Sequence, residues 1–389
     1  MTSLKHHDDP RQIAGWDRLA DHKSFYVDAD WLRFVDSDGG ADPHYLALYR
    51  GGAPAAGLVA HWNPDEGHPD YRPTGVLGHL DAPGPMVLFG GRRGFCSDVL
   101  LPDTGSAVGG PDDLAVLLNA ALDNVPEARA RWWWPYLPSE AARHVVAAAR
   151  TVQPSKTPGV QLLGADCIVD LVGRELDDHI DALPVKQQRT NARREIRRFD
   201  ESGLEVRQSR LSETWEQGAP LLGQVQRKYG HDMSDDRLRG FLRRQAEHLD
   251  RSAVVFAVFD GSRLTGFSLC YRTGRELALR LLGLDYPRLR EASEYAQLML
   301  YAPLRYCYVN GLTRLHLGTE SYDAKCRRGA RIRPLWAITS DPPAESRAAD
   351  DRLGALTEQL PSRAAASLVT EVRTSLMAWK ASSRPAEGL

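Results

Sequence analysis

A short segment of the chain concentrates positive charge in a pattern that could bind phosphate groups. Residues 186–198 contain six basic residues and one acidic residue, Glu195, although the whole chain of 389 residues has a formal net charge of only -2. Four of the basic residues follow spacings of three, four and four, so they share one face of a helix. The six are Lys186, Arg189, Arg193, Arg194, Arg197 and Arg198. Cationic side chains that contact a nucleic-acid backbone release condensed counterions, so this strip predicts RNA binding. The alternative is a solvated helix face that pairs with acidic neighbours.

A histidine between two expected helices is the second group that could do chemistry. His231 lies in a polar loop, and an imidazole titrates near neutral pH, so it can act as a general base. The alternative is a side chain that lines the substrate or is simply exposed. The five cysteines share no metal-ligand spacing, and we expect neither a metal site nor disulfides. Residues 90–94 (GGRRG) lack the strand-loop-helix setting and the Lys-Ser/Thr ending of a phosphate-binding P-loop.

Length and composition limit the class of protein. A chain of 389 residues with 42% hydrophobic and 26% charged residues suits two globular domains, each large enough to bury a core. No run of about 18 apolar residues exists, so we expect no membrane span and no membrane partner. The polar N-terminus lacks the apolar segment of a signal peptide, which favours a cytoplasmic protein with reduced thiols. The near-neutral net charge indicates no DNA partner.

The second half of the chain reads as an α+β domain over 165–340. A strand over 165–171 precedes one long helix over about 176–202, which carries the basic strip and ends at Gly203. Val185, Ala192, Ile196 and Phe199 follow the same helical spacing beside the strip and should dock this helix. Further elements are expected as a strand at 204–208, helices over 211–249, strands at 253–259, 264–271 and 276–284, a helix at 293–310, and strands at 313–317 and 335–339. The order predicts a mixed central sheet.

The first half shows a related but less regular pattern over 1–150. Aromatic and apolar residues have helical spacing at 16–19 and 31–35, and two alternating segments at 45–49 and 55–62 flank a GGAP turn, as in a hairpin. An amphipathic helix is expected at 112–125 and an aromatic strand at 131–136. Residues 151–164 are marked by Pro and Gly and predict a boundary between the two domains. The tail over 341–389 is rich in Ala, Arg and Glu and is expected to be helical.

The order of elements in the second half resembles the FemAB-like branch of the GNAT acyltransferase superfamily. The segments KQQRTNARREIRRF at 186–199 and LHLGTESYDAKCRRGARIRP at 315–334 carry the resemblance. It covers 165–340 well and 16–62 faintly. This branch joins two GNAT-like domains in one chain, so the resemblance implies an α+β fold of two tandem GNAT-like domains with mixed central sheets. Its best-known members move an amino acid from aminoacyl-tRNA onto an amine of a cell-wall precursor.

The resemblance also implies a reaction centre. A lysine near the end of the second domain, followed by a basic residue and a glycine, lies at the centre in this branch, and Lys325 matches that place. An ammonium there would stabilise the tetrahedral oxyanion of aminolysis, and Glu320, Tyr322 and Asp323 around it could orient it or receive a proton from the attacking amine. Four more cations suit the terminal phosphates of a tRNA: Arg327, Arg328, Arg331 and Arg333. The alternative for Lys325 is a solvated loop side chain. Cys326 could form a thioester, but adjacent side chains diverge.

Three functions remain open from the sequence. The leading one is an amide-forming aminoacyltransferase that takes its donor from tRNA and needs no cofactor. The second is an acyl-CoA-dependent N-acyltransferase, although residues 285–297 (DYPRLREASEYAQ) lack the glycines that bring backbone N–H groups to the coenzyme A pyrophosphate. The third is a non-catalytic RNA-binding module. Carboxylates beside Lys325 and a basic strip favour an enzyme.

Overall fold

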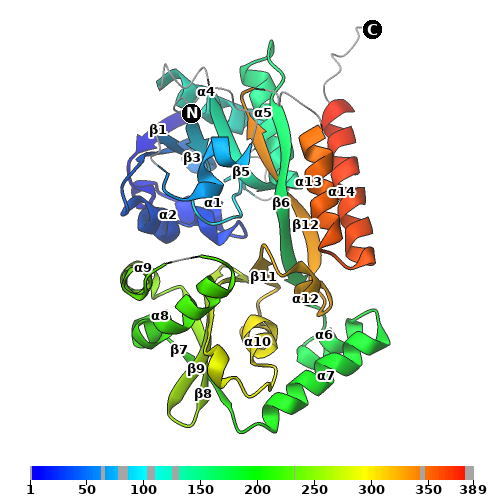
Figure 1. Cartoon of the computed structure of the whole chain (residues 1–389). Coiled ribbons are helices and arrows are strands. Elements are labelled where there is room, and N and C mark those ends of the chain that lie inside the picture. Colours follow the sequence, from blue (N-terminus) through cyan, green and yellow to red (C-terminus); the bar gives the residue numbers. More distant parts are fainter. Residues whose placement is uncertain are drawn as a thin grey trace. The chain divides into compact units, whose positions relative to one another are not determined.

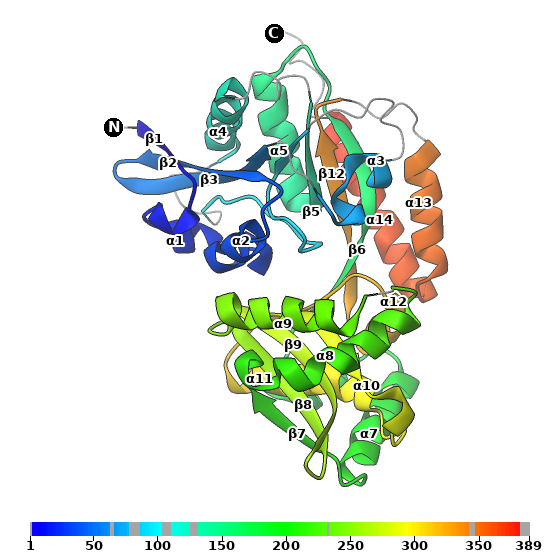
Figure 2. The same cartoon turned by 60° about the vertical axis from the view of Figure 1, so that its left-hand side comes forward.

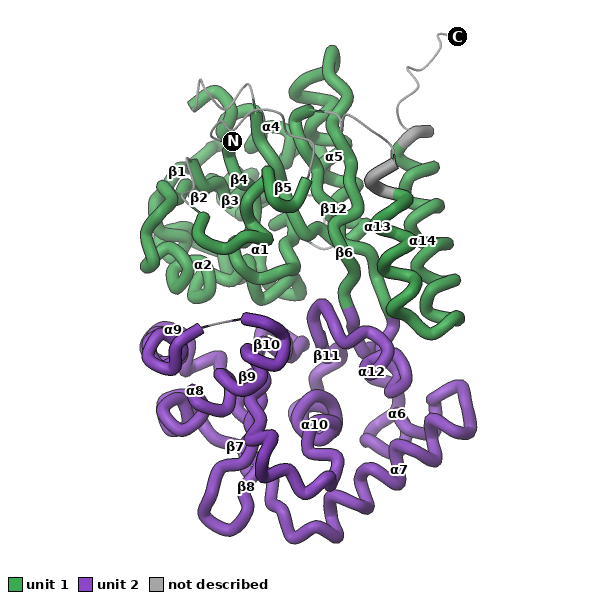
Figure 3. Tube along the Cα trace, viewed as in Figure 1, with its two compact units in different colours: residues 1–166, 332–389 green, residues 167–331 purple. Residues whose placement is uncertain are grey.

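The computed structural model describes residues 2–62, 66–77, 86–102, 110–124, 131–231, 233–341 and 347–381, with the backbone alone at 347–349 and 380–381. It divides into two units (Figure 3). Unit 1 comprises Met1–Asp166 and Ile332–Leu389, and unit 2 comprises Cys167–Arg331. We expected the second domain to reach residue 340, whereas the last strand of the chain lies almost entirely in unit 1. Among the described residues no helix is long and apolar enough to cross a membrane.

Unit 1 is built on a mixed sheet. Its strands are β1 (Thr2–His7), β2 (Asp42–Arg50), β3 (Ala53–Trp62), β4 (Val87–Phe89), β5 (Trp132–Pro138), β12 (Arg331–Thr339) and β6 (Gly159–Asp170), and they follow one another in that spatial order. All recorded pairs are antiparallel except β4–β5. The sequence did not predict β1, whose six residues pair with β2 at the edge of the sheet. The polar composition of that segment fits an edge strand that faces water.

Helices cover this sheet and form the C-terminal tail. They are α1 (Trp16–Ala20), α2 (Ala29–Asp36), α3 (Pro73–Val76), α4 (Pro111–Asn124), α5 (Ser139–Val152), α13 (Arg347–Glu358) and α14 (Ser362–Ala381). The two tail helices lie side by side in both views (Figures 1 and 2). The expected boundary at 151–164 is instead the end of α5 and the start of β6, because the Pro-Gly segment is a short turn between them.

Three adjacent tryptophans of β5 are all buried, because both faces of the strand lie in the core of unit 1. Trp132 and Trp134 point to the same face, where their rings contact Phe89 at centroid distances of 5.7 and 5.8 Å. Trp133 points the other way, into a cluster with Tyr71 and other apolar residues. The period of two in a strand separates the rings in this way.

The strands of unit 2 continue the order of the same 12-stranded sheet after β6. The strand order in this part is β6-β11-β10-β9-β8-β7, with β7 (Glu205–Ser209), β8 (Ala253–Asp260), β9 (Arg263–Thr273), β10 (Glu276–Leu284) and β11 (Arg314–Gly318). Pairing is antiparallel except between β10 and β11. All five strands lie where the sequence predicts them. The two-residue turn after Asp260 closes the β8–β9 hairpin.

Helices cover both faces of this sheet, as Figure 1 shows. On one side lie α8 (Leu211–Lys228) and α9 (Asp235–Leu249), which pack against each other (Figure 2). On the other side lie α6 (Leu176–Ala182), α7 (Lys186–Asp200), and a continuous helical segment made of α10 (Glu294–Ala296), a π turn (Gln297–Tyr301) and α11 (Ala302–Val309). The short α12 (Tyr322–Cys326) follows β11.

The expected single helix over 176–202 is wrong. Pro184 separates α6 from α7, because proline has no N–H and forces the preceding residue out of the helical region. Leu183 is accordingly extended, with ψ of 130°. The predicted docking face holds for Ala192 and Phe199, which are buried, but Val185 sits at the start of α7 and is 48% exposed.

Candidate active site in the second unit

A pocket of about 190 Å³ opens in unit 2 where β10 and β11 separate. The two strands are paired over only three positions, from Glu276 with Arg314 to Ala278 with His316. Beyond them β10 continues along β9 alone, and its residues 279–282 line the pocket together with Leu317 and residues 319–321. Splayed parallel strands leave backbone groups and side chains of both strands facing one opening, which is a natural place for a substrate.

The register of β10 changes at the pocket. Leu279 pairs with Cys270 and Leu281 with Leu269, so Arg280 is an extra residue in the strand, a β-bulge. Bulges redirect side chains and occur frequently beside active sites. Arg280 lines the pocket, and residues 279–282 are only half-buried although three of them are leucines. Periodicity in the sequence predicts the strand but gives no sign of this bulge.

Lys325 lies in the wall of this pocket. Only 5% of the residue is exposed, and its Nζ donates hydrogen bonds to the carbonyl oxygens of Thr319 (2.7 Å) and Gly318 (3.2 Å) at the end of β11. The lysine is therefore held by the backbone in a defined position. A buried, fixed ammonium is a suitable electrostatic partner for negative charge that develops in a transition state.

The turn that carries Lys325 has an unusual backbone. Glu320 and Ser321 have φ values of 65° and 48°, a left-handed conformation that is costly for residues with side chains. Ser321 forms a hydrogen bond with Tyr295, whose pKa is raised by burial and only partly lowered by that bond. Gly329 closes the turn with φ of 99°, and a Cβ there would lie 2.8 Å from the His179 ring. The glycine in the Lys-x-x-x-Gly pattern is thus required by both conformation and space.

The structure brings three of the four predicted catalytic residues to one pocket. Lys325, His231 and Glu320 all line it, from α12, the loop after α8 and the end of β11, respectively. His231 and Glu320 are exposed. Tyr322 is 7% exposed and does not line the pocket. Sequence analysis missed several other lining residues, and no motif marks them: Gln226, Arg280, Tyr286, Tyr295, Thr319 and Ser321.

The basic residues predicted to bind RNA fall into two groups. Five are engaged with partners inside unit 2: Arg189 with the Leu183 carbonyl, Arg193 with Asp181, Arg327 with Asp323, Arg328 with Glu195, and Arg331 with Asp170. Burial opposes ionisation of Asp170, but the pKa of its carboxyl is held low by Arg331 and Arg314. Lys186, Arg197 and Arg198 are exposed on α7 and pair with no described residue. Arg194 is also exposed and reaches only Asn191, at 3.3 Å.

The helix that follows β10 begins with a carboxylate. Glu294 is 4% exposed, and its Oε1 accepts a 2.6 Å hydrogen bond from the backbone N–H of Arg290. A buried acidic side chain at a helix N-terminus already satisfies the positive end of the helix dipole. Residues 285–297 also contain no glycine that would bring backbone N–H groups close to a pyrophosphate group.

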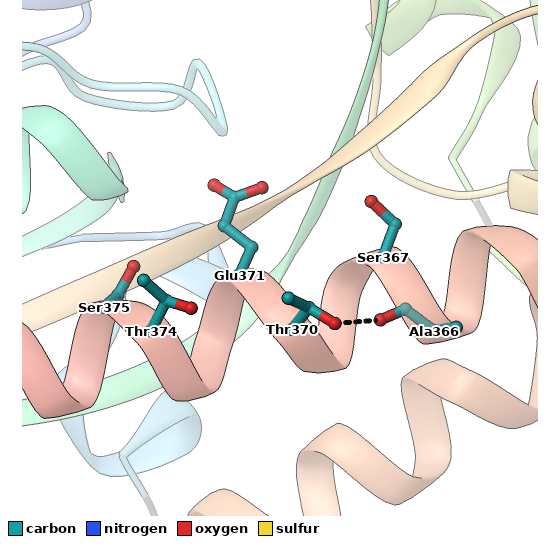
Figure 4. A pocket seen from close by; sticks show the side chains of 6 residues that line it. All are labelled: Ala366, Ser367, Thr370, Glu371, Thr374 and Ser375. Atoms are coloured by element: carbon teal, nitrogen blue, oxygen red, sulfur yellow. Dashed lines mark hydrogen bonds between the residues drawn. The ribbon is translucent and has the colours of Figure 1, made fainter.

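A larger depression of about 460 Å³ lies on α14 of unit 1, and Figure 4 shows its lining. The six lining residues all belong to that one helix: Ala366, Ser367, Thr370, Glu371, Thr374 and Ser375. The Thr370 hydroxyl donates to the Ala366 carbonyl at 2.9 Å, within the helix itself. Because this surface gathers no groups from separate elements, the pocket of unit 2 is the candidate site.

Comparison with known proteins identifies the domain that contains this pocket. Residues 186–325, which include α7, β10 and Lys325, match the family model of the acetyltransferase (GNAT) domain. The crystal structure of FemX superposes on 86% of this chain and 96% of its own with a TM-score of 0.61 and 12% sequence identity. The chain has the FemAB-like GNAT fold. The predicted α+β class with mixed strand pairing and a helical tail is confirmed, but the described strands belong to one 12-stranded sheet and not to two separate sheets.

Two further solved structures resemble this chain in fold. A conserved protein of unknown function from Bacteroides thetaiotaomicron has a TM-score of 0.53 and 10% identity, over 87% of this chain and all 100% of that one. The C-terminal domain of a putative lysylphosphatidylglycerol synthetase from Agrobacterium fabrum has a TM-score of 0.51 and 11% identity, over 90% and 95%. Such identities establish the fold alone. Among curated protein sequences none matches the chain. The GNAT-domain match supports an acyltransferase.

Proposed function

We propose that this FemAB-like protein transfers an aminoacyl group from aminoacyl-tRNA to the amine of a small metabolite or peptide precursor. The observation that carries the proposal is the meeting of Lys325, His231 and Glu320 at one pocket between splayed strands. Aminolysis of an ester needs a positioned amine, a partner for the oxyanion and a proton acceptor, and these residue types can supply the last two.

In the proposed reaction the amine nitrogen attacks the ester carbonyl carbon of the aminoacyl-tRNA. The new C–N bond forms as the carbonyl oxygen takes on negative charge beside the Lys325 ammonium. The ester C–O bond then breaks, and the terminal ribose oxygen leaves and takes up a proton, either from solvent or from the group that received the amine proton. The proton lost by the amine passes to His231 or to Glu320, both of which are exposed and can return it to solvent. The products are an amide and deacylated tRNA.

The size of the pocket agrees with a small transferred group. At about 190 Å³ it is smaller than the roughly 300–1,000 Å³ of pockets that enclose drug-sized ligands. It suits a single amino-acid residue, while the rest of the donor would stay outside. Lys186, Arg197 and Arg198, which face solvent on α7, are the cations we assign to the tRNA backbone. An RNA-bound donor implies a cytoplasmic reaction.

The second candidate is acyl transfer from coenzyme A, which the GNAT-domain match favours. Against it stands the segment leading into the helix after β10, which has no glycine to allow close approach of a pyrophosphate and places the buried Glu294 carboxylate at the first residue of that helix. We therefore place tRNA ahead of coenzyme A as the donor carrier. We also propose that unit 1 and unit 2 are each a GNAT-like domain, with the chemistry in unit 2.

The proposal is tested by incubating the purified protein with a mixture of charged tRNAs and a metabolite extract, and searching for a new amide by mass spectrometry. Matched reactions contain the same tRNA after alkaline deacylation, or acetyl-coenzyme A without tRNA. An amide that appears only with charged tRNA supports the proposal. An amide that appears only with the coenzyme A donor would move the assignment to the second candidate. Tight RNA binding without any amide product would instead identify the protein as a non-catalytic RNA-binding module.

A further inference from the structure

The one acidic residue in the basic strip, Glu195, faces the interior of unit 2. It lies three residues after Ala192 and four before Phe199, both buried, so the three share the inner face of α7. Its carboxylate accepts two hydrogen bonds from Arg328, from Nη2 at 2.6 Å and from Nε at 3.0 Å. The hydroxyl of Tyr301, in the π turn, donates to Oε2 at 2.6 Å. Both side chains of the ion pair are about one-fifth exposed (19% and 20%).

Arg328 in turn braces the turn that carries Lys325. Its Nη1 donates to the Ala324 carbonyl at 2.8 Å, and its backbone N–H donates to the Lys325 carbonyl at 3.0 Å. The Lys325 carbonyl also accepts from the backbone N–H of Ala330 at 3.1 Å. Glu195 is thus connected to Lys325 indirectly: it binds the Arg328 guanidinium, and Arg328 binds the backbone of the turn at Ala324 and Lys325.

The Arg328 guanidinium keeps its positive charge at neutral pH. Burial alone would lower the pKa of Arg328, but the hydrogen bonds and charge of Glu195 outweigh burial and raise it. Burial, together with the hydrogen bond to Glu195, raises the pKa of Tyr301, which therefore stays a neutral donor. Burial lowers the pKa of His179, and its ring Nε2 donates a hydrogen bond to the Arg328 carbonyl at 2.9 Å. A bidentate carboxylate–guanidinium pair fixes both orientation and distance.

We propose that Glu195 is a positioning residue that fixes Arg328 and, through it, the turn that carries Lys325. The basic helix α7 and the reaction pocket are therefore parts of one braced structure, in which the outer face of α7 can hold a polyanion while the inner face holds the catalytic turn. The inference rests on the proposed function only where it assigns a role to Lys325. The bracing of the turn itself can be measured without any substrate.

Cys326 provides that substrate-free measurement. It adjoins Lys325 and is half-buried, whereas the other four cysteines of the chain are buried. A hydrogen bond with Cys167 lowers the pKa of its thiol in spite of burial. The rate at which iodoacetamide alkylates Cys326 therefore reports on how firmly the turn is held. Peptide mapping identifies the labelled thiol.

The test compares Glu195→Gln with Glu201→Gln, which makes the same change of charge at the exposed C-terminal end of the same helix. We expect Glu195→Gln to speed Cys326 alkylation several-fold and to lower kcat about tenfold or more, because a misplacement of about 1 Å can cost roughly a hundredfold. KM for charged tRNA should stay unchanged, and Glu195→Asp should restore part of both effects. Glu201→Gln should behave as wild type.

Several outcomes overturn the inference. Wild-type alkylation rate and wild-type kcat in Glu195→Gln would show that Arg328 is held without Glu195. Equal effects in the two Gln variants, or a change in KM alone, would assign Glu195 to the charge of the RNA-binding face. If Glu195→Gln does not fold, the Glu195→Asp variant carries the same comparison. If the wild-type protein transfers no aminoacyl group, the proposed function fails, while the alkylation rates still decide the positioning role.

Discussion

Replacing Lys325 by alanine removes the only group that we assign to the developing oxyanion. One such preorganised donor contributes about 3–4 kcal/mol to transition-state stabilisation, so kcat and kcat/KM should fall together by about 10²–10³-fold. Binding of the donor should change far less, because the interaction exists mainly in the transition state. Lys325→Arg should rescue only part of the rate, since a planar fork does not fit the space of a lysine that is 5% exposed.

The same substitution has a cost for folding that the assay must separate from catalysis. Lys325→Ala leaves the carbonyls of Gly318 and Thr319 without their charged donor. Hydrogen bonds to charged groups contribute about 1.5–3 kcal/mol each, so we expect a total loss of about 2–4 kcal/mol after relaxation. For a unit of this size that lowers Tm by roughly 5–15 °C. Turnover should therefore be measured well below the Tm of the variant, at saturating charged tRNA, with folding checked by circular dichroism.

Two results would refute this reasoning about Lys325. Turnover close to that of the wild type in a folded Lys325→Ala variant would remove the lysine from the catalytic residues, and Glu320 and His231 would be tested next. A raised KM with kcat intact, reproduced in the wild type by added salt, would mean that Lys325 grips a phosphate instead. The two patterns differ in kcat, which makes the experiment decisive.

Three other predictions test binding and stability. The double variant Arg197→Gln/Arg198→Gln should weaken RNA binding and leave Tm unchanged. The slope of the logarithm of the binding constant against the logarithm of the salt concentration should become shallower by about 1.4–1.8, because two phosphate contacts are lost. A matched pair of substitutions on α9 is the control. The pKa of Asp28 is raised from 3.8 to about 6, mainly by burial. As pH rises from 4 to 6, the Asp28 carboxyl ionises in the unfolded chain before it ionises in the folded protein. Its burial therefore lowers the free energy of unfolding by up to about 3 kcal/mol above pH 6 and has no effect below pH 4. Asp28→Asn should therefore raise Tm at pH 7.5 but not at pH 4; equal shifts at both values would exclude this cause. Gly283→Ala would press its Cβ against Phe267 and lower stability by about 1–3 kcal/mol in thermal unfolding.

Local patterns were enough to predict most elements of unit 2. The β8–β9 hairpin follows from Asp260-Gly261, and the strands of the sheet follow from apolar alternation, because turn chemistry and periodicity are properties of neighbouring residues. The predicted elements were wrong at two places, where a single proline or a distant partner strand outweighed the local pattern. Pro184 ended α6 inside a segment with continuous helical spacing. Thr2–His7 formed an edge strand with no apolar alternation of its own, because β2 supplied the partner.

The candidate site divides in the same way between sequence and structure. Spacing alone placed four of the six cations of α7 on one face, and the resemblance to the FemAB-like branch singled out Lys325. Only the tertiary structure decided which of these charges face solvent and which are already paired, since Arg328 and Glu195 are 133 residues apart in the chain. It also decided that His231 and Lys325 line one pocket. A pocket between splayed strands depends on where long-range pairing stops, and no local periodicity encodes that point.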